Sequence, residues 1–471
     1  MRAARCFSSR RVQPFGRVFR RFLDIPSRRC ETFGREVTHH VFRGPSKIEN
    51  PKSKIADVVR RTLPNGARLQ ALENPTSETT VVSGLLLGGA TCDPAGLEGL
   101  TLLSSNVADR ATARLTYEQI YERVDSLGAV LSIGCGTHAI GFYAKCLSRD
   151  WPTVADLLIE MLREASFPDA ELDRARGELL THLDQLETDT RSVAERELGH
   201  LVYPVGHPLR HPTHGYRPVI ESARRDDLVA CHARLFRPDA LLMTLVGNVP
   251  AAQALDGLAE RLGDWPRPAE ALPSLDLAAC HPDQAQRRAV PVPDKTQVDI
   301  ALGFKGIPRT HPNYYALDQA TLILGGMALM GRLGDNVRDR QGLAYYAFAR
   351  MREGFGDGLW GIRAGVNPAN AERAIASALD EIRRMQDQPV TDQEIADVQS
   401  YLVGVLPLRI ETNDGLAGAL NSIELYGLGA DYIARYPDII RSVTRDAIQR
   451  AAQSHLTAER YSLAIAGPVG P

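Results

Sequence analysis

The strongest constraint on the fold is an order of secondary-structure elements that occurs twice along the 471 residues. In each half the apolar periodicity and the turn residues indicate a strand, helices, two strands, further helices and a closing strand. The two closing strands have related sequences, Leu-Val-Gly-Asn-Val at 245–249 and Ile-Ala-Gly-Pro-Val at 465–469. A repeated set of strands and helices predicts a duplicated α+β domain.

Local signals place the individual elements. Pro64-Asn65-Gly66 predicts a hairpin turn, and Thr116 with Gln119 has the spacing of a helix capping box. In the first half we expect strands over 58–63, 67–72, 80–87, 129–134, 138–147 and 241–246, and helices over 96–110, 116–127, 151–165, 168–188 and 250–262. In the second half we expect strands over 296–304, 343–351, 355–364 and 461–469, and helices over 312–325 (continuing irregularly to about 340), 367–387, 391–405, 412–427 and 444–457.

A proline-rich segment separates the two halves. Proline-rich connections form semi-rigid spacers, so we interpret residues 265–294 as a linker. The predicted organisation is a basic tail over 1–52, a first domain over 53–264, this linker, and a second domain over 295–471.

The N-terminal segment differs in composition from the rest. Residues 1–30 contain nine arginines, no lysine and one acidic residue, Asp24, and without them the chain has a formal charge of −10. An arginine-rich segment poor in acids resembles a mitochondrial transit peptide. A disordered tail, or an upstream extension outside the mature protein, has the same composition, so both interpretations stay open. The predicted location is the cytoplasm, with the mitochondrial matrix as the alternative.

Composition excludes several classes of protein. Charged residues make up 24% of the chain and hydrophobic residues 44%, which is typical of globular proteins. The seven cysteines are scattered and form no C-x-x-C pair, which argues against a disulfide framework or a cysteine zinc cluster. No apolar run approaches 18 residues, so no transmembrane helix is expected. The net charge of −2 does not indicate a nucleic-acid partner.

A series of short motifs occurs in the order found in a known family. They are Pro64-Asn65-Gly66, Asp93-Pro94-Ala95-Gly96-Leu97, Asp125-Ser126-Leu127-Gly128-Ala129, His207-Pro208-Leu209-Arg210, Phe236-Arg237-Pro238-Asp239, Leu245-Val246-Gly247-Asn248-Val249, Leu324-Gly325-Gly326 and Val337-Arg338-Asp339-Arg340-Gln341-Gly342-Leu343-Ala344-Tyr345. Together they resemble the M16 family of insulinase, pitrilysin and the mitochondrial processing peptidase, over residues 55–469. The resemblance implies an α+β fold of two homologous domains, each a mostly antiparallel sheet packed with several helices. Two such domains form half of the family's clamshell.

The sequence departs from this family at the zinc motif. Active members carry H-x-x-E-H on the first helix, where the two histidines share a helical face and the glutamate acts as general base. The corresponding positions here are Gly99, Leu102 and Leu103, and none of these side chains binds zinc or transfers a proton. We therefore expect no catalytic or metal-binding residues in this chain, and zinc in a partner subunit.

Other candidate ligands are interpreted as structural. The resemblance places a third zinc ligand within 174–187, where Glu178 and Glu187 are predicted to lie on solvated helix faces. Three clustered histidines are separated by prolines that interrupt any helix, and they correspond to a structural loop of the family: His207, His211 and His214.

The second half retains one feature of active members. The resemblance identifies Arg338 and Tyr345 as a pair that hydrogen-bonds the substrate carbonyl and stabilises the oxyanion, with Gly342 ending the helix between them. Taken without the family, they are a surface helix residue and a packed sheet residue. The glycine-rich run over 324–334 is interpreted as close packing of helices, and it lacks the ending of a phosphate loop.

The function implied is that of a non-catalytic subunit of a heterodimeric M16 zinc peptidase. It would bind an extended peptide and supply Arg338 and Tyr345 to a partner bearing H-x-x-E-H, with no nucleic acid involved. Three alternatives remain: a structural subunit like the core subunits of a respiratory complex, a peptide-binding homodimer without catalysis, and a self-sufficient peptidase with other ligands.

Overall fold

The computed structural model describes residues 57–272, 275–278, 282–327 and 330–469. The chain divides into two compact units, residues 1–50 and 51–471, and every described residue belongs to the second. The predicted tail or transit peptide over 1–52 lies outside the described residues.

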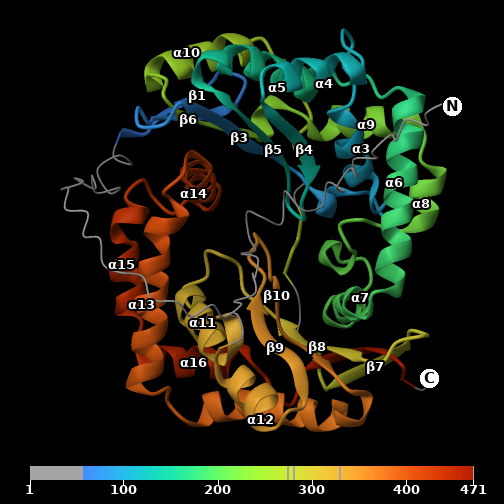
Figure 1. The fold of residues 1–471 in the computed structure, drawn as a ribbon, viewed down its shortest axis with the longest axis vertical. Helices are drawn as coiled ribbons and strands as arrows, with labels where there is room; N and C mark the ends of the chain where they lie inside the picture. The colour runs from blue at the N-terminus through green and yellow to red at the C-terminus, as the bar shows by residue number, and fades with distance from the viewer. Residues whose placement is uncertain (1–56, 273–274, 279–281, 328–329, 470–471) are drawn as a thin grey trace, which may run out of the picture. The chain divides into compact units, whose positions relative to one another are not determined.

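The first half contains a six-stranded sheet (Figure 1). In spatial order its strands are β1 (Val59–Thr62), β2 (Arg68–Glu73), β6 (Leu241–Gly247), β3 (Thr79–Leu87), β5 (Ala139–Leu147) and β4 (Val130–Cys135). The β2–β6 pair is parallel, and the other pairs are antiparallel.

The second half contains a five-stranded sheet whose topology matches that of the first sheet without its edge strand β1. Its spatial order is β7 (Gln286–Pro291), β11 (Ser462–Gly467), β8 (Val298–Lys305), β10 (Leu359–Val366) and β9 (Ala344–Met351). Its parallel pair, β7–β11, is in the place of β2–β6. The order β2-β6-β3-β5-β4 therefore matches β7-β11-β8-β10-β9, which confirms the predicted duplication and the α+β class.

Helices cover one face of each sheet. The described helices are α3 (Leu100–Ala108), α4 (Tyr117–Ser126), α5 (Trp151–Glu164), α6 (Asp169–Thr188), α7 (Thr190–Val202), α8 (Arg217–Ser222), α9 (Arg225–Leu235), α10 (Ala251–Leu262), α11 (Tyr314–Thr321), α12 (Ala371–Asp387), α13 (Asp392–Arg409), α14 (Asn413–Tyr426), α15 (Tyr432–Ser442) and α16 (Arg445–His455). Helices α3, α5, α9 and α10 contribute to the apolar core of the first sheet, and α11, α12 and α16 to that of the second.

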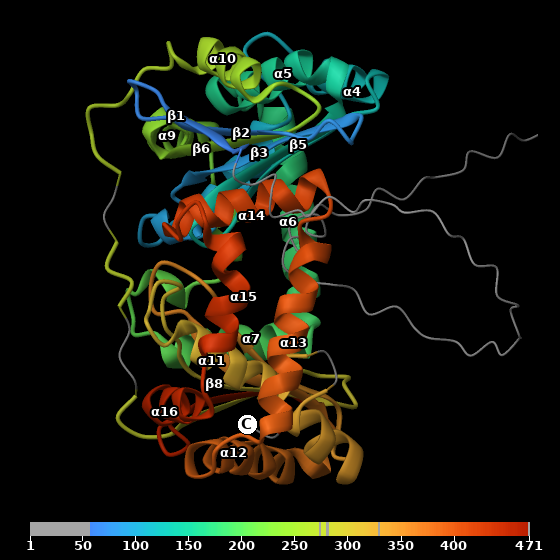
Figure 2. The ribbon, with the colours of Figure 1, turned by 90° about the vertical axis from the view of Figure 1, so that its left-hand side faces the viewer.

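The two halves exchange one helix each. Helix α7 belongs to the first half but packs on β8 and β11 of the second sheet, where Val193 and Leu198 meet Ala301 and Ala464. Helix α14 belongs to the second half but packs on β3 and β6 of the first sheet (Figure 2). Each sheet therefore completes its second apolar face with a helix from the other half.

Several sequence-based boundaries need correction. The segment 265–294 is not wholly a linker, because β7 pairs with β11 and so belongs to the second sheet. The helix predicted over 96–110 begins at Leu100, because Gly96 and Gly99 have φ of 84° and 108°. The strand predicted over 355–364 is β10, Leu359–Val366. Helices α7, α8, α9 and α15 were not predicted. None of the helices in the described ranges is long and apolar enough to cross a bilayer.

Candidate functional site

The start of α3, where the zinc motif would lie, is closed by a loop. Gly99 is the N-cap of α3, and a Cβ atom on it would lie 2.9 Å from the Cα of Gly215 and 2.9 Å from the carbonyl oxygen of His214. Leu103 is completely buried in the first core, and Leu102 packs against that core. Apolar contacts and a neighbouring backbone therefore occupy the place where ligands would be needed.

A carboxylate holds this helix end in place. Asp93 accepts hydrogen bonds from the backbone amides of Gly99 and Thr101, at 2.8 and 2.9 Å. Burial raises the pKa of Asp93, although these hydrogen bonds oppose the change. The carboxylate compensates amides at the N-terminus of a helix, which is a structural role.

The other candidate ligands do not converge. Glu178 on α6 accepts from the buried guanidinium of Arg110 at 2.6 Å, and Glu187 is exposed. His207 stacks on a tyrosine, His211 bonds the Tyr216 hydroxyl at 3.0 Å, and burial lowers the pKa of His214 to about 4. In the described part of the chain, no three His, Cys, Asp or Glu side chains are grouped so that they could hold a metal ion.

Tyr345 lies in a bulge of an edge strand. Val366 of β10 pairs with Ala344 and Gly365 pairs with Tyr346, so Tyr345 has no partner on β10. Its side chain is 84% exposed. Bulges re-aim side chains and are frequent beside active sites. The strand presents the phenol to solvent, which excludes the interpretation of Tyr345 as a packed sheet residue.

Arg338 lies in the π-helical segment Gly334–Arg340 that precedes β9. Its Nε donates to Asp339 at 2.7 Å, and its side chain is 24% exposed. Gly342 has a φ of 61° and ends this segment, which agrees with the role predicted for it. No described contact joins Arg338 to Tyr345. Their roles toward a substrate remain predictions.

Helix α7 anchors the strand that carries Tyr345. Asp299 on β8 is buried and accepts hydrogen bonds from the hydroxyls of Tyr346 and Thr190, the first residue of α7. The Arg191 guanidinium lies 4.3 Å from the centre of the Tyr346 ring. Sequence analysis did not single out these residues, although an aspartate inside an apolar strand was an available signal.

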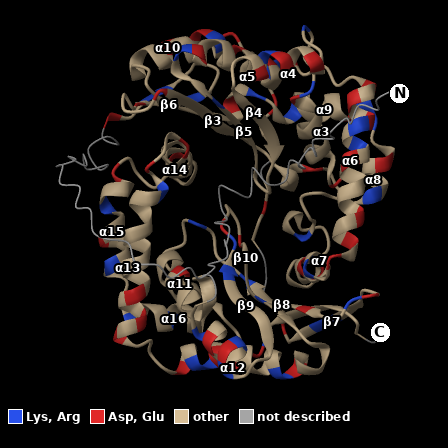
Figure 3. Ribbon diagram, in the orientation of Figure 1, with Lys and Arg blue, Asp and Glu red and all other residues tan. Residues whose placement is uncertain are grey.

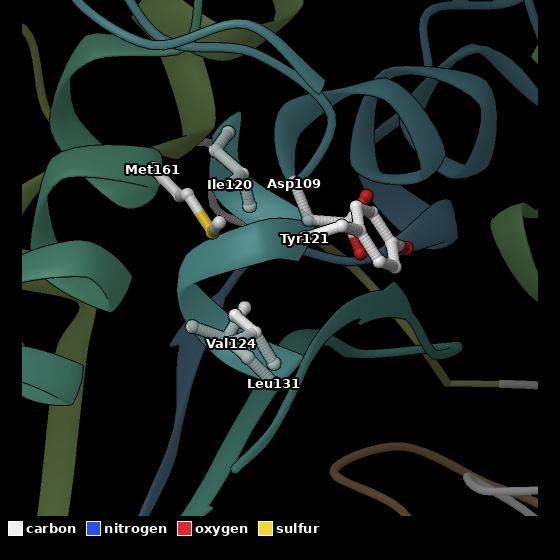
Figure 4. Close-up of a pocket in the computed structure, with 6 residues that line it drawn as sticks. All are labelled: Asp109, Ile120, Tyr121, Val124, Leu131 and Met161. Atoms are coloured by element: carbon white, nitrogen blue, oxygen red, sulfur yellow. The ribbon is translucent and has the colours of Figure 1, made fainter. Parts of the chain in front are cut away.

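A small pocket lies at the other end of α3 (Figure 4). It is lined by Asp109, Ile120, Tyr121, Val124, Leu131 and Met161. It encloses about 230 Å³ even when the open solvent at its mouth is counted, which is below the roughly 300–1,000 Å³ of small-molecule sites. Burial raises the pKa of Asp109 to about 7. The pocket does not indicate a small-molecule ligand.

Comparison with known proteins identifies the family. The model described as insulinase (peptidase family M16) matches residues 69–213, and the model described as peptidase M16 inactive domain matches residues 222–402. The chain therefore belongs to the M16 peptidase family.

Individual relatives extend over most of the chain. It is 25% identical to an uncharacterized zinc protease of Streptomyces coelicolor, over 88% of this chain and 90% of that protein. It is 23% identical to the mitochondrial-processing peptidase subunit beta of Lentinula edodes, over 87% and 89% of the two chains. The crystal structure of a peptidase M16 inactive domain from Pseudomonas fluorescens has a TM-score of 0.82 and 21% identity, over 88% and 98% of the chains. This likeness confirms the predicted fold.

Proposed function

We propose that this chain is the non-catalytic subunit of a two-subunit M16 peptidase. The observation that carries the proposal is the start of α3, where Gly99, Leu102 and Leu103 replace the zinc ligands and the general base. Because the loop at Gly215 leaves no space for a Cβ at residue 99, a histidine there would need the backbone to move.

The second half supports a contribution to a shared site. Tyr345 is exposed on a bulge, and Arg338 lies at the surface of the preceding π-helical segment. A phenol and a guanidinium are suitable donors to a substrate carbonyl or to a developing oxyanion. In this proposal the partner subunit supplies H-x-x-E-H and zinc, and this chain supplies these donors and part of the peptide-binding wall.

The test is reconstitution with an M16 chain from the same source that contains H-x-x-E-H. We expect the isolated chain to cleave no peptide. The mixed complex should cleave peptides until a chelator is added. Tyr345→Phe should lower kcat about 100-fold, as loss of an oxyanion donor does, with little change in KM.

The matched control is Tyr401→Phe, because Tyr401 is also a solvent-exposed tyrosine, at 38% exposure on α13. It should leave kcat unchanged. Equal activity of the Tyr345→Phe complex and the unaltered complex would refute the role of the phenol. Peptide binding by a homodimer without cleavage in any mixture would instead support the non-catalytic binding protein.

A further inference from the structure

The face of the second sheet that carries α7 continues beyond that helix onto β9 and β10. Three antiparallel pairs lie side by side there: Gly361 with Arg350, Arg363 with Phe348, and Gly365 with Tyr346. Directly opposed residues share a face of the sheet. The alternate residues of β10, such as Ile362 and Ala364, belong to the core on the other face. This part of the sheet therefore presents arginine and aromatic side chains.

Figure 3 shows basic positions on β9 and β10. Four arginines of this sheet face and of α7 lie near one another, and we call them the basic patch: Arg191, Arg350, Arg352 and Arg363. Two carboxylates lie among them. Glu195 of α7 is 3.4 Å from Nε of Arg363 and 3.8 Å from Nη2 of Arg352. Asp299 accepts from Tyr346 and Thr190 instead of from a guanidinium. Arg350 has no ion-pair partner among the described residues. The patch thus holds two positive charges more than its carboxylates balance.

Of the four arginines, only Arg363 is buried, and the other three are exposed. The Arg363 side chain is 8% exposed, and it shares its one carboxylate with Arg352. Burial, together with the positive charges of Arg352 and Arg350, lowers the pKa of Arg363, against the opposing effect of Glu195. A guanidinium remains charged at any physiological pH. A carboxylate bound by the exposed guanidinium groups of Arg350 and Arg352 would reduce their repulsion of the buried Arg363.

We propose that the basic patch binds the acidic side chains of an extended peptide. The inference rests on the proposed function, because it assigns a substrate class to the same peptide-binding wall. Arg350 and Arg352 are two residues apart, which matches the repeat of side chains on one face of an extended chain. Guanidinium groups pair carboxylates in a bidentate geometry. Tyr346 and Phe348 supply aromatic surface beside them.

The charge of the rest of the chain favours a peptide over a nucleic acid. Residues 31–471 have a formal charge of −10, which repels a long polyanion. A short acidic segment requires only the local excess of positive charge.

The test is fluorescence anisotropy with the full chain alone and two labelled 12-residue peptides. One carries alternating glutamates, and the other carries glutamine at the same positions. We expect the acidic peptide to bind at least tenfold more tightly at low salt and to lose this advantage at high salt. Arg350→Gln with Arg352→Gln should weaken its binding about 3- to 20-fold and leave the glutamine peptide unaffected. The control is Arg383→Gln, an exposed arginine on α12.

Equal binding of the two peptides, or an unchanged affinity in the double variant, would overturn the proposal. Displacement of the acidic peptide by inorganic phosphate or by an oligonucleotide at equal charge concentration would also overturn it, because the patch would then be a general anion site. The measurement needs no partner, zinc or cleavage. If no catalytic partner is found, the chain can still prefer the acidic peptide. If an active complex forms, it can still lack that preference. The subunit role and the binding of acidic peptides can therefore be refuted independently.

Discussion

Restoring the zinc motif tests whether the loss of metal binding is structural as well as chemical. The variant is Gly99→His with Leu102→Glu and Leu103→His, which creates the motif H-x-x-E-H at the start of α3. If side-chain chemistry alone were missing, this variant would bind zinc. The structure predicts that it will not, because residue 99 has a φ of 108° and a Cβ there would lie 2.9 Å from two backbone atoms.

The penalty can be divided into two parts with single substitutions. A non-glycine residue at positive φ costs about 1–2 kcal/mol. Forcing atoms into a filled space costs a further 1–3 kcal/mol or so. Gly99→Ala should therefore lower the free energy of unfolding by about 2–5 kcal/mol. Gly96→Ala is the matched control, since Gly96 also has positive φ, at 84°, but a Cβ there has no atom within 4 Å. It should lose only about 1–2 kcal/mol.

The assays are urea unfolding of each variant and zinc analysis of the purified triple variant. We expect the triple variant to be strongly destabilised, since it also places polar groups at the fully buried position 103, and to hold well under one zinc per chain. A folded triple variant with one tightly bound zinc would refute the reasoning. Equal losses in Gly99→Ala and Gly96→Ala would show that the loop at Gly215 moves away freely.

Two further outcomes follow from the buried groups and from the exchanged helices. Burial raises the pKa of Asp109 to about 7, so between about pH 4 and 7 the folded chain keeps a proton that the unfolded chain has released, and stability falls as the pH rises through that range. Asp109→Asn should make the free energy of unfolding less dependent on pH, and it should stabilise the protein by up to about 4 kcal/mol at pH 8, with no gain near pH 4. Parallel curves of unfolding free energy against pH for the two proteins would contradict the raised pKa of Asp109. A protease site inserted after Leu275 should yield, on cleavage, two fragments that stay associated and unfold together. The reason is that α7 and α14 each complete the sheet of the other half. Fragments that separate and remain folded would show that the exchanged helices are dispensable.

Elements with strong local signals were predicted closely. The capping box is present, with Gln119 N donating to Thr116 Oγ1 and Thr116 N donating to the Gln119 side chain. The alternation in 138–147 became β5, Ala139–Leu147, because its apolar residues Ile140 and Phe142 face the first core. Each of these elements depends on neighbouring residues, which is the information that a single sequence carries.

Elements stabilised by distant partners were missed. β7 consists mostly of exposed residues between prolines, and its signal is its parallel pairing with β11, far away in the sequence. The contact that closes the start of α3 also depends on a segment far away in the sequence. The replacement of the ligands was visible at Gly99, but its contact with Gly215 joins two segments that the sequence separates by more than 100 residues. Such contacts follow from the tertiary fold.

The exchanged helix explains why a first half without a zinc site would still be needed. Helix α7 covers one face of the second sheet, and its first residue, Thr190, bonds the buried Asp299 that also holds Tyr346. Tyr346 directly follows the exposed Tyr345, so the bulge is fixed from a helix that the first half supplies. The same helix contributes Arg191 and Glu195 to the basic patch. The absence of zinc ligands from α3 does not affect these contacts of α7. Without the first half, however, both the bulge at Tyr345 and the basic patch, which we assign to peptide binding, would lose the support of α7.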